Sequence, residues 1–141
     1  MLLIHDHLHD WNPELPRIRL AADRNTLAKR RWRGLAEDGT EFGFDLEHPL
    51  VDGDVYHVSE TAVYSVRQIP EPVLEISLGE HPAAAARLGW MIGNLHFQIA
   101  IENGVVLAID DPAIRQLLTR EHIEFEPAIR VFRAFGGGHS H

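Results

Sequence analysis

Histidine is the residue of this sequence whose number and spacing suggest chemistry. The 141 residues include ten histidines and no cysteine, so a metal site here must use imidazole, carboxylate and water as ligands. These ligands suit nickel, copper, zinc and cobalt, and by affinity alone copper binds tightest. The histidines are His5, His7, His9, His48, His57, His81, His96, His122, His139 and His141.

Two groups of histidines differ in how the chain is expected to hold them. His96 follows a segment in which the pattern predicts that a helix ends at Gly93 and a strand begins. His139 and His141 follow three consecutive glycines, which predicts a flexible tail that swings with little strain. One fixed imidazole and a mobile pair indicate transient capture of a metal ion rather than catalysis.

Each of these groups also has a plain interpretation. Taken alone, His96 is more simply an exposed or hydrogen-bonded histidine of a strand, because a single imidazole does not hold a metal well. The ending with His139 and His141 is equally a terminus without a role. A metal site therefore depends on both groups acting together, or on the His96 of a second copy of the chain.

A third group of histidines lies near the N-terminus, in the segment HDHLHD. On a strand, His5, His7 and His9 would share one face and could form a second metal site. The favoured interpretation is a solvated face of an N-terminal strand. The remaining histidines are isolated in the sequence and are expected at the surface: His48, His57, His81 and His122.

The elements that must position these residues fall into two halves, which meet at the two prolines of Ile69-Pro70-Glu71-Pro72. Short strands separated by Asp-Gly turns predict a β-rich sandwich or barrel over residues 1–70. Residues 71–128 are predicted to form a ferredoxin-like βαββαβ domain, so the fold class is α+β. Residues 129–141 are expected to be a flexible Gly/His tail.

The order of elements in the second half determines where His96 would lie. We expect strands over 73–78, 95–101, 105–109 and 123–126, and helices over 82–91 and 112–120. Alternation over 95–101 would place Phe97, Ile99 and Ile101 under the helices. His96 would then lie on the opposite, open face, which can be solvated or can pair with a second copy.

Composition limits the classes of function. The formal net charge of −8 argues against a nucleic-acid binder, because neutralising phosphates requires a basic face. No apolar run approaches the roughly 20 residues that span a bilayer, and the N-terminus does not resemble a signal peptide. We therefore expect a cytoplasmic protein that binds neither nucleic acid nor membrane. The common hydrolase, nucleotide-binding and zinc-protease motifs are absent from the sequence, so we predict that it is not an enzyme.

The sequence resembles the UreE family, the dimeric nickel metallochaperones of urease assembly. In the second half, Leu88-Gly89 followed by Gly93-Asn94-Leu95-His96 is similar to the family signature LG-x-x-x-GN-x-H. Weaker similarities occur in the same order along the chain: Asp23-Arg24, Lys29-Arg30-Arg31, Asp38-Gly39, Val51-Asp52-Gly53-Asp54-Val55, Asp110-Asp111 and Phe125-Glu126-Pro127.

The resemblance implies a β-rich partner-binding domain and a ferredoxin-like metal-binding domain in a homodimer. His96 of each subunit would bind one Ni²⁺ on the twofold axis, with His139 and His141 as auxiliary ligands, and Zn²⁺ or Cu²⁺ could replace nickel in vitro. Nickel would pass to a UreG-like maturation GTPase and to apo-urease.

The sequence departs from the family at two positions near His96. Leu95 stands where the family usually has an arginine, and Met91 stands where it often has a histidine. The tail is also short, which predicts a small metal load.

Two functions of other classes remain as alternatives. A metal-independent interaction or assembly protein would carry its histidines incidentally, and a nickel affinity only in the millimolar range would favour it. A small metal-dependent hydrolase would need a carboxylate base beside an open metal position. The sequence offers no such base at a recognisable spacing, so the hydrolase ranks last.

Overall fold

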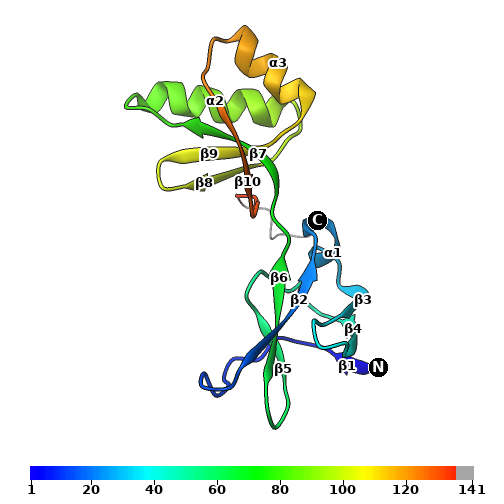
Figure 1. Cartoon of the computed structure of the whole chain (residues 1–141). Helices are drawn as coiled ribbons and strands as arrows, with labels where there is room; N and C mark the ends of the chain where they lie inside the picture. The colour runs from blue at the N-terminus through cyan, green and yellow to red at the C-terminus, as the bar shows by residue number, and fades with distance from the viewer. Residues whose placement is uncertain (136–141) are drawn as a thin grey trace. The chain divides into compact units, whose positions relative to one another are not determined.

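The computed structural model describes residues 1–135 and divides into two compact units, Met1–Ile69 and the chain from Pro70 onward. Figure 1 shows strands and a short helix in the first unit, and a sheet with two longer helices in the second. The predicted α+β fold class is confirmed. Within residues 1–135, no helix is both long and apolar enough to cross a membrane.

The N-terminal unit contains two three-stranded sheets. One has the order β1-β4-β3, and the other has the order β2-β6-β5. The strands are β1 (Leu2–Ile4), β2 (Arg17–Ala22), β3 (Arg31–Leu35), β4 (Glu41–Asp45), β5 (Val55–Val58) and β6 (Val63–Gln68), and the short helix α1 spans Arg24–Leu27. β1 pairs with β4, and β2 with β6, in parallel, and the connections between these partners are long enough for the crossover that parallel pairing requires.

An aromatic core lies between these two sheets. Phe42 and Phe44, on the same face of β4, contact Tyr56 of β5 with ring centres 4.9 and 5.1 Å apart. Tyr64 of β6 approaches Phe42 with ring centres 5.2 Å apart. These are edge-to-face contacts, the geometry that aromatic quadrupoles favour. Side chains from both sheets therefore fill one shared core, as the prediction of a β-rich sandwich requires.

The C-terminal unit has one four-stranded sheet of order β10-β7-β9-β8, with antiparallel pairing throughout. Its two helices lie on one side of the sheet in Figure 1. The elements are β7 (Glu71–Ser77), α2 (Pro82–Asn94), β8 (Ile99–Glu102), β9 (Val105–Ile109), α3 (Pro112–Arg120) and β10 (Glu126–Arg130). This order and connectivity confirm the predicted ferredoxin-like arrangement.

The helix-covered face of this sheet holds the main core of the C-terminal unit. Leu74 and Ile76 of β7 pack there with Ile92 of α2 and Ile114 of α3. On the other face, Phe132 is 1% exposed and packs against strand residues of β7, β8 and β9. The predicted open face is therefore partly covered, and folded chain continues past residue 128, where the tail was expected to begin.

Two element boundaries in the C-terminal unit differ from those predicted. α2 continues through Gly93 to Asn94, and β8 begins only at Ile99, so the strand predicted over 95–101 is wrong in its first half. Phe97 and Ile99 do pack against the helix-side core, whereas Ile101 is exposed. The last strand was predicted over 123–126, but β10 begins only at Glu126 and runs to Arg130. Residues 123–125 belong to the connection after α3.

Candidate metal centre

His96 lies in the turn that follows α2 and not in a strand. The N–H of His96 donates to the carbonyl of Gly93 at 2.9 Å, and the N–H of Phe97 donates to the carbonyl of Ile92 at 3.4 Å. This pair of bonds is a Schellman cap, which satisfies carbonyls at the end of a helix. The cap requires one left-handed residue, and here that residue is His96, with φ of 66°.

Packing explains why the helix does not stop at Gly93. Met91 and Ile92 are both buried in the helix-side core, and Phe97 packs against the same core immediately after the cap. Glycine inside a helix costs about 1 kcal/mol relative to alanine. Burial of one large apolar side chain contributes about 1.5–3 kcal/mol, so the packing outweighs the propensity of Gly93.

The last two turns of α2 and the residues after them expose apolar side chains. Trp90, on the outer face of α2, is 67% exposed, and Leu95 and His96 are exposed next to it in sequence. Ala86 precedes Trp90 by one helical turn and is exposed too. Tryptophan is enriched in protein interfaces relative to the rest of the surface.

The described part of the chain ends close to the His96 turn. The backbone N–H of Phe135 donates to the carbonyl of Ile99, which is three residues beyond His96. The other two predicted ligands, His139 and His141, lie outside the described residues. Within residues 1–135, no three histidine, aspartate or glutamate side chains are grouped so that they could hold a metal.

The three N-terminal histidines do not form the predicted strand face. β1 ends at Ile4, and the segment that follows is not part of a sheet. The rings of His7 and His9 contact each other with centres 4.6 Å apart. His5 instead places Nδ1 3.0 Å from the carbonyl oxygen of Asp45. The structure thus joins His7 and His9 and separates His5 from them.

The isolated histidines have different surroundings. His48, His81 and His122 are exposed, as expected, whereas His57 is half-buried beside the aromatic core of the N-terminal unit. His122 has φ of 57° and donates its backbone N–H to the carbonyl of Thr119 at 3.2 Å. It therefore closes α3 with the same kind of cap that His96 provides for α2.

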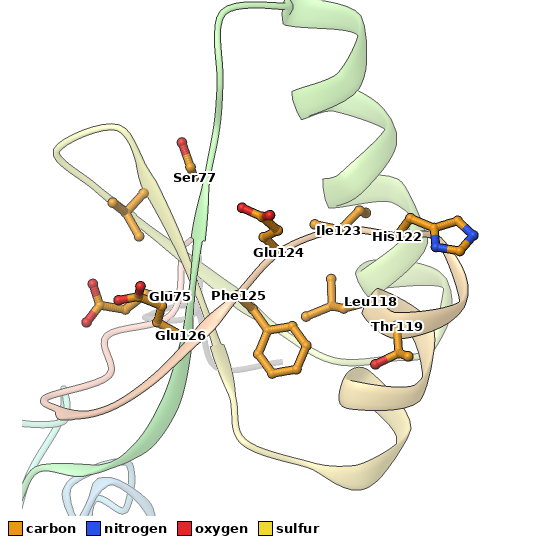
Figure 2. A pocket seen from close by; sticks show the side chains of 10 residues that line it. Glu75, Ser77, Leu118, Thr119, His122, Ile123, Glu124, Phe125 and Glu126 are labelled. Carbon is orange, nitrogen blue, oxygen red and sulfur yellow. The ribbon is translucent and has the colours of Figure 1, made fainter.

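A hollow of about 770 Å³ lies beside the connection between α3 and β10. Figure 2 shows Glu75 and Glu126 close together on one side of it, as expected for directly paired positions of β7 and β10. The imidazole of His122 points away from these carboxylates at the other side. The side chains do not converge, so the hollow offers neither an acid–base pair nor a set of metal ligands.

Several acidic residues in the segments that carry the family resemblance have structural roles. Asp111 accepts a hydrogen bond from the N–H of Ala113 at 2.8 Å and caps α3. Asp110 accepts two bonds from the Arg115 guanidinium, at 2.6 and 2.9 Å, which lower the pKa of this carboxyl. Asp52 accepts from the backbone N–H of Gln68 at 2.7 Å. These carboxylates are engaged in holding loops and a helix end.

Comparisons with known proteins agree with this architecture. Residues 71–141 match the model of the C-terminal domain of the UreE urease accessory protein. The chain is 30% identical to the urease accessory protein UreE of Burkholderia ambifaria over 132 residues, which are 89% of this chain and 64% of that protein. It is 33% identical to the UreE of Paracoccus denitrificans over 113 residues, 79% of this chain and 70% of that protein.

A third relative, the UreE of Burkholderia lata, is 30% identical over 96 residues, which are 65% of this chain and 46% of that protein. The chain thus spans less than two thirds of the length of both Burkholderia proteins.

Proposed function

The chain belongs to the UreE family of urease accessory proteins, and from this we propose that it is a nickel metallochaperone that delivers Ni²⁺ for assembly of the urease active site. In this proposal two chains form a homodimer, and His96 from each binds one shared ion. His139 and His141 complete the coordination. The cargo passes to a UreG-like maturation GTPase and to apo-urease in the cytoplasm, and the protein catalyses no reaction of its own.

The observation that carries this proposal is the fixed, exposed position of His96. The two hydrogen bonds of the Schellman cap hold its backbone, and the adjacent Phe97 is anchored against the core. A ligand on a fixed backbone loses little conformational entropy when it binds an ion. One imidazole gives low affinity, so the single exposed histidine of this turn is suited to sharing a metal with a second copy.

The exposed Trp90 supports the proposed dimer. Tryptophan is among the residues that contribute most to protein interfaces, and here it lies on the same helix that His96 terminates. An isologous contact through this face places the two copies of each residue about one twofold axis. The two His96 side chains would then approach each other beside the buried tryptophans.

The position of Phe135 supports a role for the tail histidines. A chain extends by at most about 3.5 Å per residue, so His96 lies within roughly 10 Å of Ile99. The four residues from Phe135 to His139 reach up to roughly 14 Å. Because Phe135 is hydrogen-bonded to Ile99, both tail imidazoles are within reach of the His96 turn.

The proposal is tested by nickel titration calorimetry on the full chain and on His96→Gly. Glycine suits the left-handed position, so this substitution removes the imidazole and keeps the cap. We expect the affinity to fall by more than the roughly 10- to 100-fold that follows loss of an outer-shell partner. Ending the chain at Phe135 should weaken binding by a smaller factor, about tenfold.

The matched control is His122→Gly, which changes the same residue type in the same kind of cap at the end of α3. It should bind nickel like the unaltered chain. Equal affinities for the unaltered chain and His96→Gly would refute the proposal. A nickel affinity only in the millimolar range for the unaltered dimer would favour the alternative, a metal-independent assembly protein.

A further inference from the structure

The N-terminal segment that follows β1 holds a pair of histidines in a defined arrangement. The backbone N–H of Leu8 donates to the carbonyl of Val55 at 2.7 Å, and Leu8 is half-buried. This bond fixes the segment against the first residue of β5. His7 and His9 flank Leu8 on either side, so their backbones are held by the same anchor.

Asp6 orients the first of these imidazoles. Its Oδ1 accepts the backbone N–H of His7 at 2.8 Å and lies 3.0 Å from Nδ1 of the same residue. A carboxylate that accepts from Nδ1–H leaves the lone pair of the imidazole on Nε2. The same carboxylate–histidine arrangement orients the ligands of many metal sites and raises their basicity. The His7 side chain is 39% exposed, so an ion has access to it.

The distance between the two rings suits a shared ion. The ring centres of His7 and His9 are 4.6 Å apart, with an angle of 70° between the planes. A bound metal lies about 2.1 Å from the ligating nitrogen and hence about 3.2 Å from the ring centre. An ion at this distance from both ring centres would see them at an angle of roughly 90°, which is the angle between neighbouring ligands in octahedral or square-planar coordination.

We propose that His7 and His9 form a second binding site for a divalent transition-metal ion, Ni²⁺ or Cu²⁺, with Asp6 as the positioning residue and water in the remaining coordination positions. The site lies wholly within the N-terminal unit. It needs neither His96 nor a second copy of the chain, and it therefore stands independently of the proposed function.

The charges and the number of ligands define how this site behaves. Asp6 and Asp10 are exposed on either side of the histidine pair, and their negative charge raises the local concentration of cations. Only two protein nitrogens bind the ion, so the remaining positions exchange with water. The site is consequently weaker than a three- or four-ligand site and captures and releases its ion rapidly.

The test uses the full chain carrying His96→Gly, His139→Ala and His141→Ala, which removes the ligands of the proposed nickel site. Ni²⁺ is titrated by calorimetry, and the imidazole signals are followed by ¹H–¹⁵N NMR. We expect one ion per chain and selective paramagnetic broadening of the His7 and His9 signals. Adding His7→Ala and His9→Ala together should lower the affinity at least about tenfold, and Asp6→Asn should lower it several-fold.

His5→Ala in the same background is the matched control, because Nδ1 of His5 lies against the carbonyl oxygen of Asp45. It should leave the affinity unchanged. The proposal is overturned if His5→Ala weakens binding as much as the double substitution does. It is also overturned if the double substitution leaves the nickel affinity unchanged, because the two rings would then contact each other without binding an ion. Neither result would bear on the proposed function, because that proposal is tested by comparing His96→Gly with the unaltered chain, and both of those proteins keep His7 and His9.

Discussion

At the scale of single residues, a left-handed histidine closes both helices of the C-terminal unit. A side chain with Cβ in this conformation costs about 1–2 kcal/mol relative to glycine. His96→Gly and His122→Gly should therefore both raise the thermal unfolding temperature, while only the first abolishes tight nickel binding. A stabilised protein that no longer binds nickel would show that His96 is retained for its imidazole and not for the fold.

A hydrogen bond between Tyr64 and Asp38 predicts a second residue-scale effect. The hydroxyl of Tyr64 donates to Asp38 Oδ2 at 2.6 Å, which lowers the pKa of Asp38 and raises that of Tyr64. Because the folded pKa of Asp38 is depressed, its stabilisation is present above the ordinary carboxyl pKa and is lost as the pH falls through the folded value. The contribution of Tyr64 is lost only as the pH rises above about 10.

Tyr64→Phe should accordingly raise the pKa of Asp38 toward its ordinary value and lower the unfolding temperature at neutral pH. NMR titration of the carboxyl signal and thermal unfolding measure the two effects. Tyr56→Phe is the control, because the Tyr56 hydroxyl is buried without a hydrogen-bond partner among the described residues. An Asp38 pKa that stays low in Tyr64→Phe would contradict this account of the pair.

At the scale of elements, the segment after β10 contributes to the core through one residue. Phe132 is 1% exposed and packs with Val73, Ala100 and Leu107 on the helix-free face of the sheet. Phe132→Ala should lower the free energy of unfolding by about 3–5 kcal/mol, measured by urea denaturation. Phe135→Ala, at a side chain that is 72% exposed, should change it by less than about 0.5 kcal/mol. Equal effects would contradict the assigned packing.

The elements that the sequence predicted best are those with local turn and cap chemistry. Asp111 with Pro112 marks the start of α3, and Asn103-Gly104, both with positive φ, forms the turn between β8 and β9. The end of α2 was mispredicted because the packing of Met91, Ile92 and Phe97 is a tertiary effect that overrides the low helix propensity of Gly93. Phe132 was missed because residues 129–141 were taken together as a flexible tail, and the apolar residues that surround Phe132 are too few to show a periodicity.

The place of His96 in the chain was predictable, but its local geometry was not. The pattern placed His96 directly after the helix, as the structure does, yet the left-handed position is usually glycine and gave no signal in a histidine. The contact between His7 and His9 was likewise not predictable from alternation. It depends on the hydrogen bond from Leu8 to Val55, which joins segments far apart in sequence.

At the scale of the whole molecule, the proposed homodimer depends on the outer face of α2. Trp90→Ala should weaken dimerisation by about 30-fold or more, since a central aromatic residue contributes at least about 2 kcal/mol to an interface. Sedimentation equilibrium measures this change. Leu35→Ala, at an exposed apolar side chain of the N-terminal unit, is the control and should leave the mass unchanged. A Trp90→Ala protein as dimeric as the control would place the interface elsewhere.

The most direct measurement of the central claim is native mass spectrometry of the full chain with nickel supplied at less than one ion per chain. The account predicts that the first metal-bound species is a dimer that carries one Ni²⁺, and that this species is lost in His96→Gly. Nickel-bound monomers, or dimers that fill with one ion per chain from the start, would contradict a site shared between two His96 residues.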